Sequence, residues 1–412
     1  MPEFFNVLAP DAAFDALKPM LKSSVGVEVV PVSESLGRVT AADIHSPEDL
    51  PAFPRSSMDG YSVRSRDTFG ASEGLPAYLD LVGEVPMGES ANVRLRVGQV
   101  AKAYTGGMLA EGADAVVMVE RTQALDETAI EVLRAVAPGE NVVQVGEDVR
   151  KGDVILSKGS VIRPQDIGGL LALGITHIDV CRKPRVGIIS TGDELVPPGA
   201  QVGAGQIRDI NTYTIAALVE QVGGKPIPIA LAPDDFDAQR NAAIEGLAAC
   251  DALVFSAGSS VSSRDLTADV INSLGEPGVI VHGISIKPGK PTVIGLADGK
   301  PVFGLPGNPV SAMIVFHLIV RPAIYQMSGI DSAPNSASCE ATLTRDISSD
   351  AGREDFVPVR IEHDSGRAQA IPVFGKSNLI YLLVRSDGIV KVPLDRSGLY
   401  AGDTVDVRLF LV

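Results

Sequence analysis

RVGIISTGDE at residues 185–194 is an apolar run that ends in a Gly-rich turn, and the pattern occurs again in ALVFSAGSS at 252–260 and in PVFGLPGNP at 301–309. Each turn opens a helical segment. Continuous apolar runs that alternate with helical segments are typical of parallel strands buried on both faces of a sheet. The stretch from 181 to 327 is therefore predicted to be a doubly wound α/β domain.

The three turns also predict where a ligand binds. In a sheet of parallel strands, the ligand lies outside the carboxyl ends of the strands, where turns offer backbone N–H groups and helix N-termini to anions. Three Gly-rich turns in one segment therefore indicate a pocket for a phosphorylated ligand.

The rest of the chain is predicted to be rich in β structure. From about 46 to 145, many short β segments are separated by Gly and Pro, which is typical of a β-rich insertion. Residues 339–412 alternate and contain many β-branched residues, so a small, separate β domain without a helix is expected there. The predicted domains are an N-terminal helix with linker-domain strands (1–45), a β-rich insertion domain (46–145), a return segment of the linker domain (146–180), the α/β domain with a long apolar helix at 310–325 (181–327), and a C-terminal β domain (328–412).

The composition argues against several classes of protein. A chain of 412 residues, 45% of them hydrophobic, is too long for one core and can bury several. The net charge of −16 and the lack of Trp argue against a nucleic-acid partner, because the phosphate backbone binds to a basic face. Charge, Gly or Pro interrupts the apolar stretches well short of the ~18 residues of a membrane span, so no membrane partner is expected. No signal peptide is visible, no His/Cys cluster has zinc spacing, and the scattered Cys181, Cys250 and Cys339 favour the cytoplasm.

Acidic residues accompany the first two turns. Asp193 and Glu194 follow the first apolar run, and Asp265 lies just beyond the second turn, so all three are expected at one edge of the sheet. Carboxylates that converge near phosphate oxygens are what Mg²⁺ requires, since this ion takes hard oxygen ligands. The alternative is that Asp193 caps the following turn and that Glu194 is only solvated.

Basic residues flank a Pro-Gly turn in KPGKP at 287–291. Lys287 and Lys290 can hold an oxyanion there, although an ordinary surface turn would have the same sequence. In GLPGNPVS at 304–311, Asn308 stands in position to cap a helix that starts at Pro309, whatever the turn binds. The segment SMDGY at 57–61 suggests no structural role beyond a turn.

Taken together, these motifs resemble those of the molybdopterin molybdenumtransferase family, which includes bacterial and archaeal MoeA and the gephyrin E domain. The resemblance spans most of the chain, in the family's order and spacing. The segments that carry it are RSSMDGYSVR at 55–64, TGDEL at 191–195, AGSSVSSRDLT at 257–267, KPGKP at 287–291 and GLPGNPVS at 304–311. The resemblance implies a multidomain α/β plus β fold, with a doubly wound molybdopterin-binding domain and a small C-terminal domain that is barrel-like.

Family members insert molybdate, or the nearly isosteric tungstate, into adenylylated molybdopterin and release AMP in a Mg²⁺-dependent step. The resemblance therefore implies Mg²⁺ as cofactor and a homodimer whose active cleft is shared between the α/β domain of one subunit and the β-rich domain of the other. Molybdopterin adenylyltransferase is the expected upstream partner. No Ser/His or Cys/His pair suggests a nucleophile, so positioning and electrostatics are predicted to supply the catalysis.

The resemblance also implies a role for each matching residue. Asp193, Glu194 and Asp265 would bind the metal and act in catalysis, together with Asp59, Lys287 and Lys290. The lysines would hold anionic groups of the substrate or molybdate. Substrate binding would fall to Thr105, Asp148, Thr191, Gly192, Gly258, Ser259, Ser260, Pro306, Gly307, Asn308, Arg353 and Ser377. One departure from the family pattern is Ser262-Ser263, where another Gly usually follows Val261, and a side chain there would crowd the approach of a ligand to the backbone.

Two other functions share parts of this pattern. A pterin-binding carrier or scaffold would use the same fold without turnover, but the acidic and basic motifs are all present and no interaction domain is appended. A molybdopterin adenylyltransferase would share the α/β domain, but it would not need the β-rich insertion or the C-terminal β domain.

Overall fold

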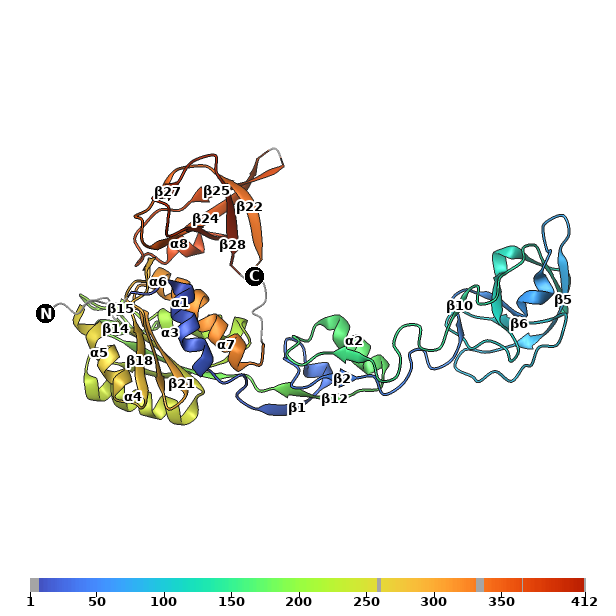
Figure 1. The fold of residues 1–412 in the computed structure, drawn as a ribbon, viewed down its shortest axis with the longest axis horizontal. Helices are drawn as coiled ribbons and strands as arrows, with labels where there is room; N and C mark the ends of the chain where they lie inside the picture. The colour runs from blue at the N-terminus through green and yellow to red at the C-terminus, as the bar shows by residue number, and fades with distance from the viewer. Residues whose placement is uncertain (1–6, 258–260, 331–336, 365, 411–412) are drawn as a thin grey trace. The chain divides into compact units, whose positions relative to one another are not determined.

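The computed structural model describes residues 7–257, 261–330, 337–364 and 366–410, and within 261–265 it describes the backbone alone. The chain divides into two compact units, both of which are drawn in Figure 1. Unit 1 contains Met1–Ala42, Lys158–Ile167 and His177–Val412, and unit 2 contains Asp43–Ser157 and Gly168–Thr176. The domain boundaries given above remain a prediction.

A six-stranded sheet forms the centre of unit 1, with the strand order β16-β13-β17-β21-β20-β18. The three quoted apolar runs are the parallel neighbours β13 (Arg185–Thr191), β17 (Ala252–Ala257) and β21 (Lys300–Pro306). β16 (Lys225–Ala232) pairs in parallel with the outer side of β13. Every residue of β17 is buried, as a strand covered on both faces requires.

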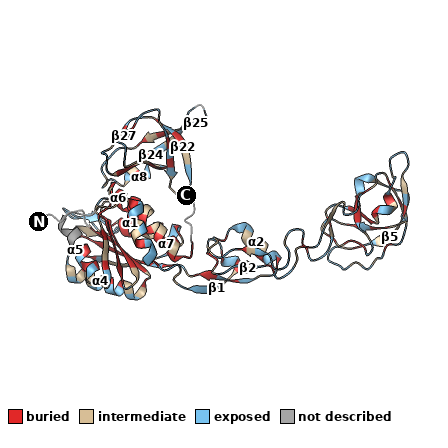
Figure 2. Ribbon diagram, viewed as in Figure 1, coloured by how far each residue is buried: buried red, intermediate tan, exposed pale blue. Residues whose placement is uncertain are grey.

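Helices cover both faces of this sheet, and the two cores between helices and sheet are buried in Figure 2. α4 (Phe236–Ala249) and α5 (Val261–Asn272) pack on the face that carries Ile189. α1 (Pro10–Leu17) and α3 (Asn211–Gln221) pack on the face that carries Ile188. Successive strand residues point to opposite faces, so these two isoleucines belong to different cores. The predicted doubly wound arrangement is confirmed.

One side of the sheet is antiparallel, which the apolar pattern did not predict. β20 (Val293–Ala297) pairs antiparallel with β21 and with β18 (Pro277–His282). β20 and β21 form a hairpin whose turn residues, Asp298 and Gly299, have φ values of +49° and +80°. Asp-Gly is a preferred sequence for a hairpin turn with two positive φ angles, so the signal was present in the sequence.

The long apolar helix is continuous from Pro309 to Met327. It consists of α6 (Pro309–Val315), the π-helical turn η5 (Phe316–Val320) and α7 (Arg321–Met327). Pro322 has no N–H to donate and its ring crowds the carbonyl one turn back, which accounts for a wider turn at this point.

This helix corrects the expectation that no apolar stretch approaches the length of a membrane span. By length and composition, 19 residues from Pro309 to Met327 could cross a membrane. Within their most apolar window, 67% of the residues are buried inside the fold, and Val315, Phe316 and Ile319 belong to the core of unit 1. A core helix of a globular domain has the same properties, so the helix is weak support for a membrane span.

The C-terminal part of unit 1 is a closed barrel, as the barrel-like prediction required. Its strands pair in the order β24 (Glu354–Asp364), β25 (Arg367–Pro372), β22 (Ser338–Leu343), β28 (Thr404–Leu409) and β26 (Gly388–Val392), and β26 pairs back with β24. A one-turn helix, α8 (Tyr381–Val384), occurs where no helix was expected. β19 (Ile286–Lys287), from the α/β part of the chain, pairs in parallel with β24 and so joins the two parts of unit 1.

Unit 2 is built on another six-stranded sheet, with the order β7-β4-β6-β5-β9-β8. Its strands are β4 (Gly60–Val63), β5 (Ala77–Glu84), β6 (Gln99–Ala103), β7 (Ala115–Met118), β8 (Thr122–Ala124) and β9 (Ala129–Val132). Unit 2 also contains the pairs β2 (Ile44–His45) with β11 (Val154–Leu156) and β3 (Arg55–Ser56) with β10 (Val142–Val143), and α2 (Pro164–Ala172) crosses the boundary between the units.

Unit 1 contains three further two-stranded pairs: β1 (Val27–Pro31) with β12 (His177–Cys181), β14 (Leu195–Val196) with β15 (Ile207–Arg208), and β23 (Ile347–Ser348) with β27 (Gly398–Leu399).

Candidate active site

The three Gly-rich turns lie at one edge of the central sheet, because β13, β17 and β21 are parallel neighbours whose carboxyl ends meet there. In the second turn, the predicted Gly258, Ser259 and Ser260 lie outside the described residues, and so does the side chain of Asp265. The first and third turns are described in full.

In the first turn, Glu194 folds back over Gly192. Gly192 is buried and has a φ of +151°, a conformation that residues other than Gly rarely adopt. A Cβ atom at this position would lie 2.7 Å from Glu194 Oε2. Thr191 is buried, and its Oγ1 has no hydrogen-bond partner within the described chain. Because a buried hydroxyl without a partner costs free energy, this oxygen is available to a ligand.

A third carboxylate, Asp234, joins Asp193 and Glu194 at this turn. Asp193 Oδ1 accepts a hydrogen bond from Asp234 N at 3.2 Å. Asp234 keeps contact with solvent, and its pKa is raised first by partial burial and then by the charges of Asp193 and Glu194. Sequence reasoning assigned Asp234 no role, although its place directly after the strand beside β13 puts it at the same sheet edge.

The donor set at the first turn fits Mg²⁺ chemically. The carboxylates of Asp193, Glu194 and Asp234 are hard oxygen ligands, and Mg²⁺ usually needs only one or two of them because it retains waters. Thr191 Oγ1 is a further oxygen without a partner in the described chain. No group of three or more acidic, His or Cys side chains has metal-ligand geometry among the residues that the structure describes, a set that omits the Asp265 side chain.

A buried polar network, which sequence reasoning missed, ties the strand ends together. Asn211 Nδ2 donates to Ser256 Oγ of β17 at 2.7 Å and to Gly307 O of the third turn at 2.8 Å. Asp209 Oδ1 accepts from Ser190 Oγ of β13 at 3.2 Å. A satisfied network of this kind fixes the positions of its members. Gly307, predicted as a substrate-binding residue, contributes its carbonyl to this network and does not line the pocket beside the third turn.

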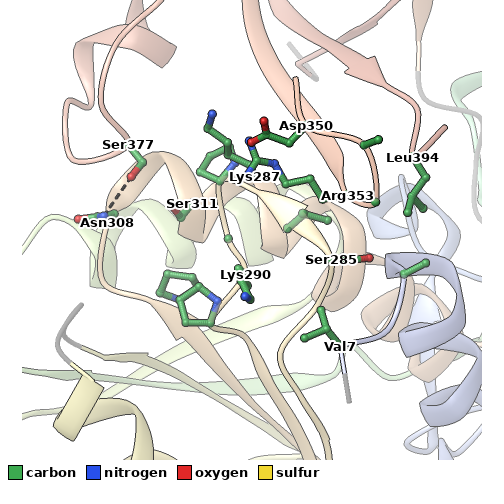
Figure 3. Close-up of a pocket in the computed structure, with 18 residues that line it drawn as sticks. Val7, Ser285, Lys287, Lys290, Asn308, Ser311, Asp350, Arg353, Ser377 and Leu394 are labelled. Carbon is green, nitrogen blue, oxygen red and sulfur yellow. Dashed lines mark hydrogen bonds and ion pairs between the residues drawn. The ribbon is translucent and has the colours of Figure 1, made fainter. Parts of the chain in front are cut away.

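A pocket of about 810 Å³ opens beside the third turn (Figure 3). Lys287, Lys290 and Arg353 contribute to its wall, together with Asn308 and Ser377. The structure therefore brings together residues that the motifs assigned to the binding of anions and substrate. Pro306 also lines the pocket as predicted, while Ser285, Ser311 and Asp350 are lining residues that sequence reasoning did not select.

Tertiary structure places Lys287 next to the barrel residues. β19 pairs in parallel with β24, so Lys287 lies opposite Asp355. Gly289 has a φ of +121°, and a Cβ atom there would lie 2.7 Å from both Ile286 Cδ1 and Val315 Cγ2. The Pro-Gly turn therefore packs closely on α6, which limits the movement of both flanking lysines.

The charges around the pocket leave a surplus of cations. Arg353 Nε donates to the buried Asp355 at 2.8 Å, and Arg353 Nη2 pairs with Asp350 at 2.7 Å. Asp355 and then Asp350 raise the pKa of Arg353, which keeps it charged. Lys287 Nζ lies 3.9 Å from Asp355 Oδ2, and Lys290 has no ion pair within the described residues. The pocket therefore attracts an anion.

Asn308 occupies the N-cap position of α6 as expected, but its side chain does not cap the helix. Asn308 Nδ2 donates instead to Ser377 Oγ at 3.0 Å, the dashed bond in Figure 3, and Val310 N donates to Ser377 O at 3.1 Å. These bonds connect the third turn with the barrel and hold Ser377 at the pocket wall.

Unit 2 carries the remaining predicted residues. Asp59 Oδ1 accepts from Thr105 N at 2.8 Å and from Thr105 Oγ1 at 2.9 Å, and these bonds lower the pKa of Asp59. Gly60 is needed for close packing of β4 and β7, because a Cβ atom there would lie 1.9 Å from Val117 O. SMDGY thus has a structural role that sequence reasoning missed. Asp148 is exposed, and among the described residues no hydrogen bond or ion pair joins it to Asp59.

Three family models match the chain in order. They are the MoeA N-terminal region (domain I and II) at residues 9–174, a probable molybdopterin binding domain at 187–326, and the MoeA C-terminal region (domain IV) at 340–410. The molybdopterin molybdenumtransferase of Haemophilus influenzae is 32% identical over 406 residues, which cover 98% of this chain and 99% of that protein. The chain belongs to the MoeA family.

Other MoeA-family comparisons agree. The molybdopterin molybdenumtransferase of Bacillus subtilis is 33% identical, over 93% of this chain and 89% of that protein. The solved structure of the molybdopterin biosynthesis MoeA protein from Pyrococcus horikoshii OT3 matches with a TM-score of 0.85 and 34% identity, covering 98% of this chain and 100% of that one. Both the family resemblance and the predicted fold class are confirmed.

Proposed function

We propose that this protein is a molybdopterin molybdenumtransferase, which inserts molybdate or tungstate into adenylylated molybdopterin and releases AMP. Its family membership gives it a role in molybdenum cofactor biosynthesis. The observation that carries the proposal is the pocket of about 810 Å³ where Lys287, Lys290 and Arg353 converge beside the third Gly-rich turn. Such a transferase must hold an oxyanion and a phosphorylated pterin together, and unit 1 offers a basic pocket at the sheet edge where the three Gly-rich turns meet.

The spacing of the two regions suits a long substrate. The acidic turn follows β13 and the basic pocket adjoins the end of β21, with β17 between these strands. Neighbouring strands lie about 4.8 Å apart, so the two regions are separated by roughly 10 Å. A substrate that joins a pterin to an adenosine through phosphate groups is long enough to span this distance, whereas a free oxyanion is not.

Within this proposal, the chain supplies positioning and electrostatic stabilisation. Lys287 and Lys290 hold the oxyanion beside the dithiolene, and Arg353 and Ser377 fix its orientation from the barrel. Two reactants held in a near-attack geometry react much faster than in solution, and fixed charges stabilise the charge that develops.

We further propose that Mg²⁺ binds at the first turn through one or two of the carboxylates of Asp193, Glu194 and Asp234, with water completing its coordination. When bound, the ion would neutralise charge on the phosphate oxygens of the substrate. The support is the set of close carboxylates with a raised Asp234 pKa and the Thr191 hydroxyl that lacks a partner in the described chain.

AMP release from adenylylated molybdopterin tests the function, measured with and without molybdate, tungstate and Mg²⁺. Release stimulated by one oxyanion supports metal insertion and names the metal. Tight binding of adenylylated molybdopterin without release of AMP would favour a pterin-binding carrier. No specific feature of the described structure supports that alternative.

We also propose a cytoplasmic homodimer in which Asp59 and Thr105 of one protomer complete the site of its partner, with molybdopterin adenylyltransferase as the upstream partner. The family resemblance and the free state of all three cysteines support this. Mixing an Asp59→Ala variant with a Lys290→Ala variant tests it, because mixed dimers would recover one intact site. If confirmed mixed dimers recover no AMP release, the proposal of a shared site is wrong.

A further inference from the structure

Three strand ends meet around Asp59 at one edge of the unit 2 sheet. In the sheet order, β6 lies between β4 and β5. Asp59 immediately precedes β4, Tyr104 and Thr105 follow β6, and Glu84 is the last residue of β5. The four polar side chains therefore come from adjacent strands, and the sequence motifs selected only Asp59 and Thr105.

The side chains form two linked pairs. Tyr104 OH donates to Glu84 Oε2 at 2.7 Å, next to the bonds from Thr105 to Asp59. The Tyr104 pKa is raised chiefly by Glu84 and also by the charge of Asp59, so both carboxylates lie near the phenol. Within the described residues, Glu84 Oε1 has no hydrogen-bond partner and Glu84 has no ion pair. Its carboxylate is oriented by Tyr104, and Oε1 together with the second lone pair of Oε2 remains to accept hydrogen bonds from a ligand.

Apolar side chains border these pairs. Met87 is 56% exposed and lies against the turn after Thr105, since a Cβ atom on Gly107 would approach Met87 Sδ to 3.1 Å. Met58, beside Asp59, is 40% exposed. Exposed, polarizable methionines and a tyrosine provide a surface on which a flat heterocycle packs.

We propose that Glu84, oriented by Tyr104, is a specificity-determining residue that binds the aminopyrimidinone edge of the pterin in the substrate. This inference rests on the proposed function, which places Asp59 at the substrate. An ionised carboxylate only accepts hydrogen bonds, and the pterin edge presents an amino group and a ring N–H side by side as donors. The base-pairing edge of adenine presents one donor and one acceptor, which suits an amide better than a carboxylate. Glu84 therefore selects the pterin end of the substrate over its adenine end.

The test compares Glu84→Gln and Tyr104→Phe with matched variants of a second Tyr–Glu pair in the same unit. Tyr78 hydrogen-bonds to Glu131, so Tyr78→Phe and Glu131→Gln make the same chemical changes elsewhere. Glu84→Gln should raise the KM for adenylylated molybdopterin about tenfold, because a charge-assisted bond is lost, and leave the KM for molybdate unchanged. Tyr104→Phe should raise the KM for adenylylated molybdopterin about threefold, because the Glu84 carboxylate stays but is no longer held in its orientation.

Binding measurements complete the test. Glu84→Gln should weaken binding of molybdopterin without AMP by the same factor and leave inhibition by AMP unchanged. Weaker inhibition by AMP, or a KM no higher than in the Tyr78 and Glu131 variants, would overturn the assignment. Thermal melting of each variant checks its fold. If the unaltered protein binds molybdopterin in a Glu84-dependent way but releases no AMP, the proposed function fails while this inference stands.

Discussion

Replacement of Arg353 by Ala tests how the basic pocket works. The guanidinium lines the pocket and bonds to the buried Asp355 at 2.8 Å. Loss of one charge-assisted hydrogen bond to an oxyanion costs about 2 kcal/mol, which is roughly a 30-fold rise in the KM for molybdate. The free energy of unfolding should fall by about 1–3 kcal/mol as well, because Asp355 loses its closest partner.

A second effect follows from the position of Lys287. Its Nζ lies 3.9 Å from Asp355 Oδ2, so without Arg353 the lysine should move toward Asp355 and away from the pocket. Asp355→Asn in the Arg353→Ala background removes that attraction and should recover part of the loss in molybdate KM.

The assay is the initial rate of AMP release over a range of molybdate concentrations, with thermal melting in parallel. Arg360→Ala is the control, since Arg360 lies on β24, which begins directly after Arg353, in an exposed pair with Glu362, and its loss should change neither quantity. An unchanged molybdate KM in a less stable Arg353→Ala protein would refute the binding role and leave Arg353 a structural residue.

Three further predictions concern other charged groups. Lys290→Ala should raise the KM for molybdate without lowering stability, because Lys290 has no ion pair within the described residues; kinetics and melting check this. Asp193→Asn and Glu194→Gln should raise the Mg²⁺ concentration needed for half-maximal AMP release while the melting temperature changes little, and equal loss of folding would contradict a role in metal binding. Burial, and then Arg321, lower the pKa of His317 to about 4. The unfolded chain therefore binds a proton below about pH 6.5 that the folded protein does not, and stability should fall by up to about 1.4 kcal/mol per pH unit between pH 6.5 and 4. In His317→Gln, the free energy of unfolding measured with urea should no longer fall between pH 6.5 and 4. If it falls as in the unaltered protein, other groups cause the pH dependence.

Most of the central sheet could be predicted from local pattern. A strand buried on both faces is apolar throughout, so β13, β17 and β21 were visible in the sequence. β18 and β20, which pair antiparallel, were not predicted, because a pattern of alternating strands and helices contains no hairpin. The Asp298-Gly299 turn signal between β20 and β21 was therefore overlooked. The expectation about apolar length failed because Pro322 does not end the helix but is accommodated beside a π-helical turn.

Part of the site was also present in the sequence, because short motifs carry their own geometry. The TGDE turn, the lysines of KPGKP and the start of α6 each follow from residues that are neighbours in the chain. Only the tertiary structure could decide which of these segments meet. Asp234 reaches the first turn through a strand pairing, Lys287 faces Asp355 through the pairing of β19 with β24, and Asn308 bonds to Ser377 across 69 residues. The sequence by itself determined the strands, turns and types of charge, since these depend on local conformational preference and burial. The partners of each charge depend on contacts between distant segments, and those are fixed only when the sheet and the barrel pack together.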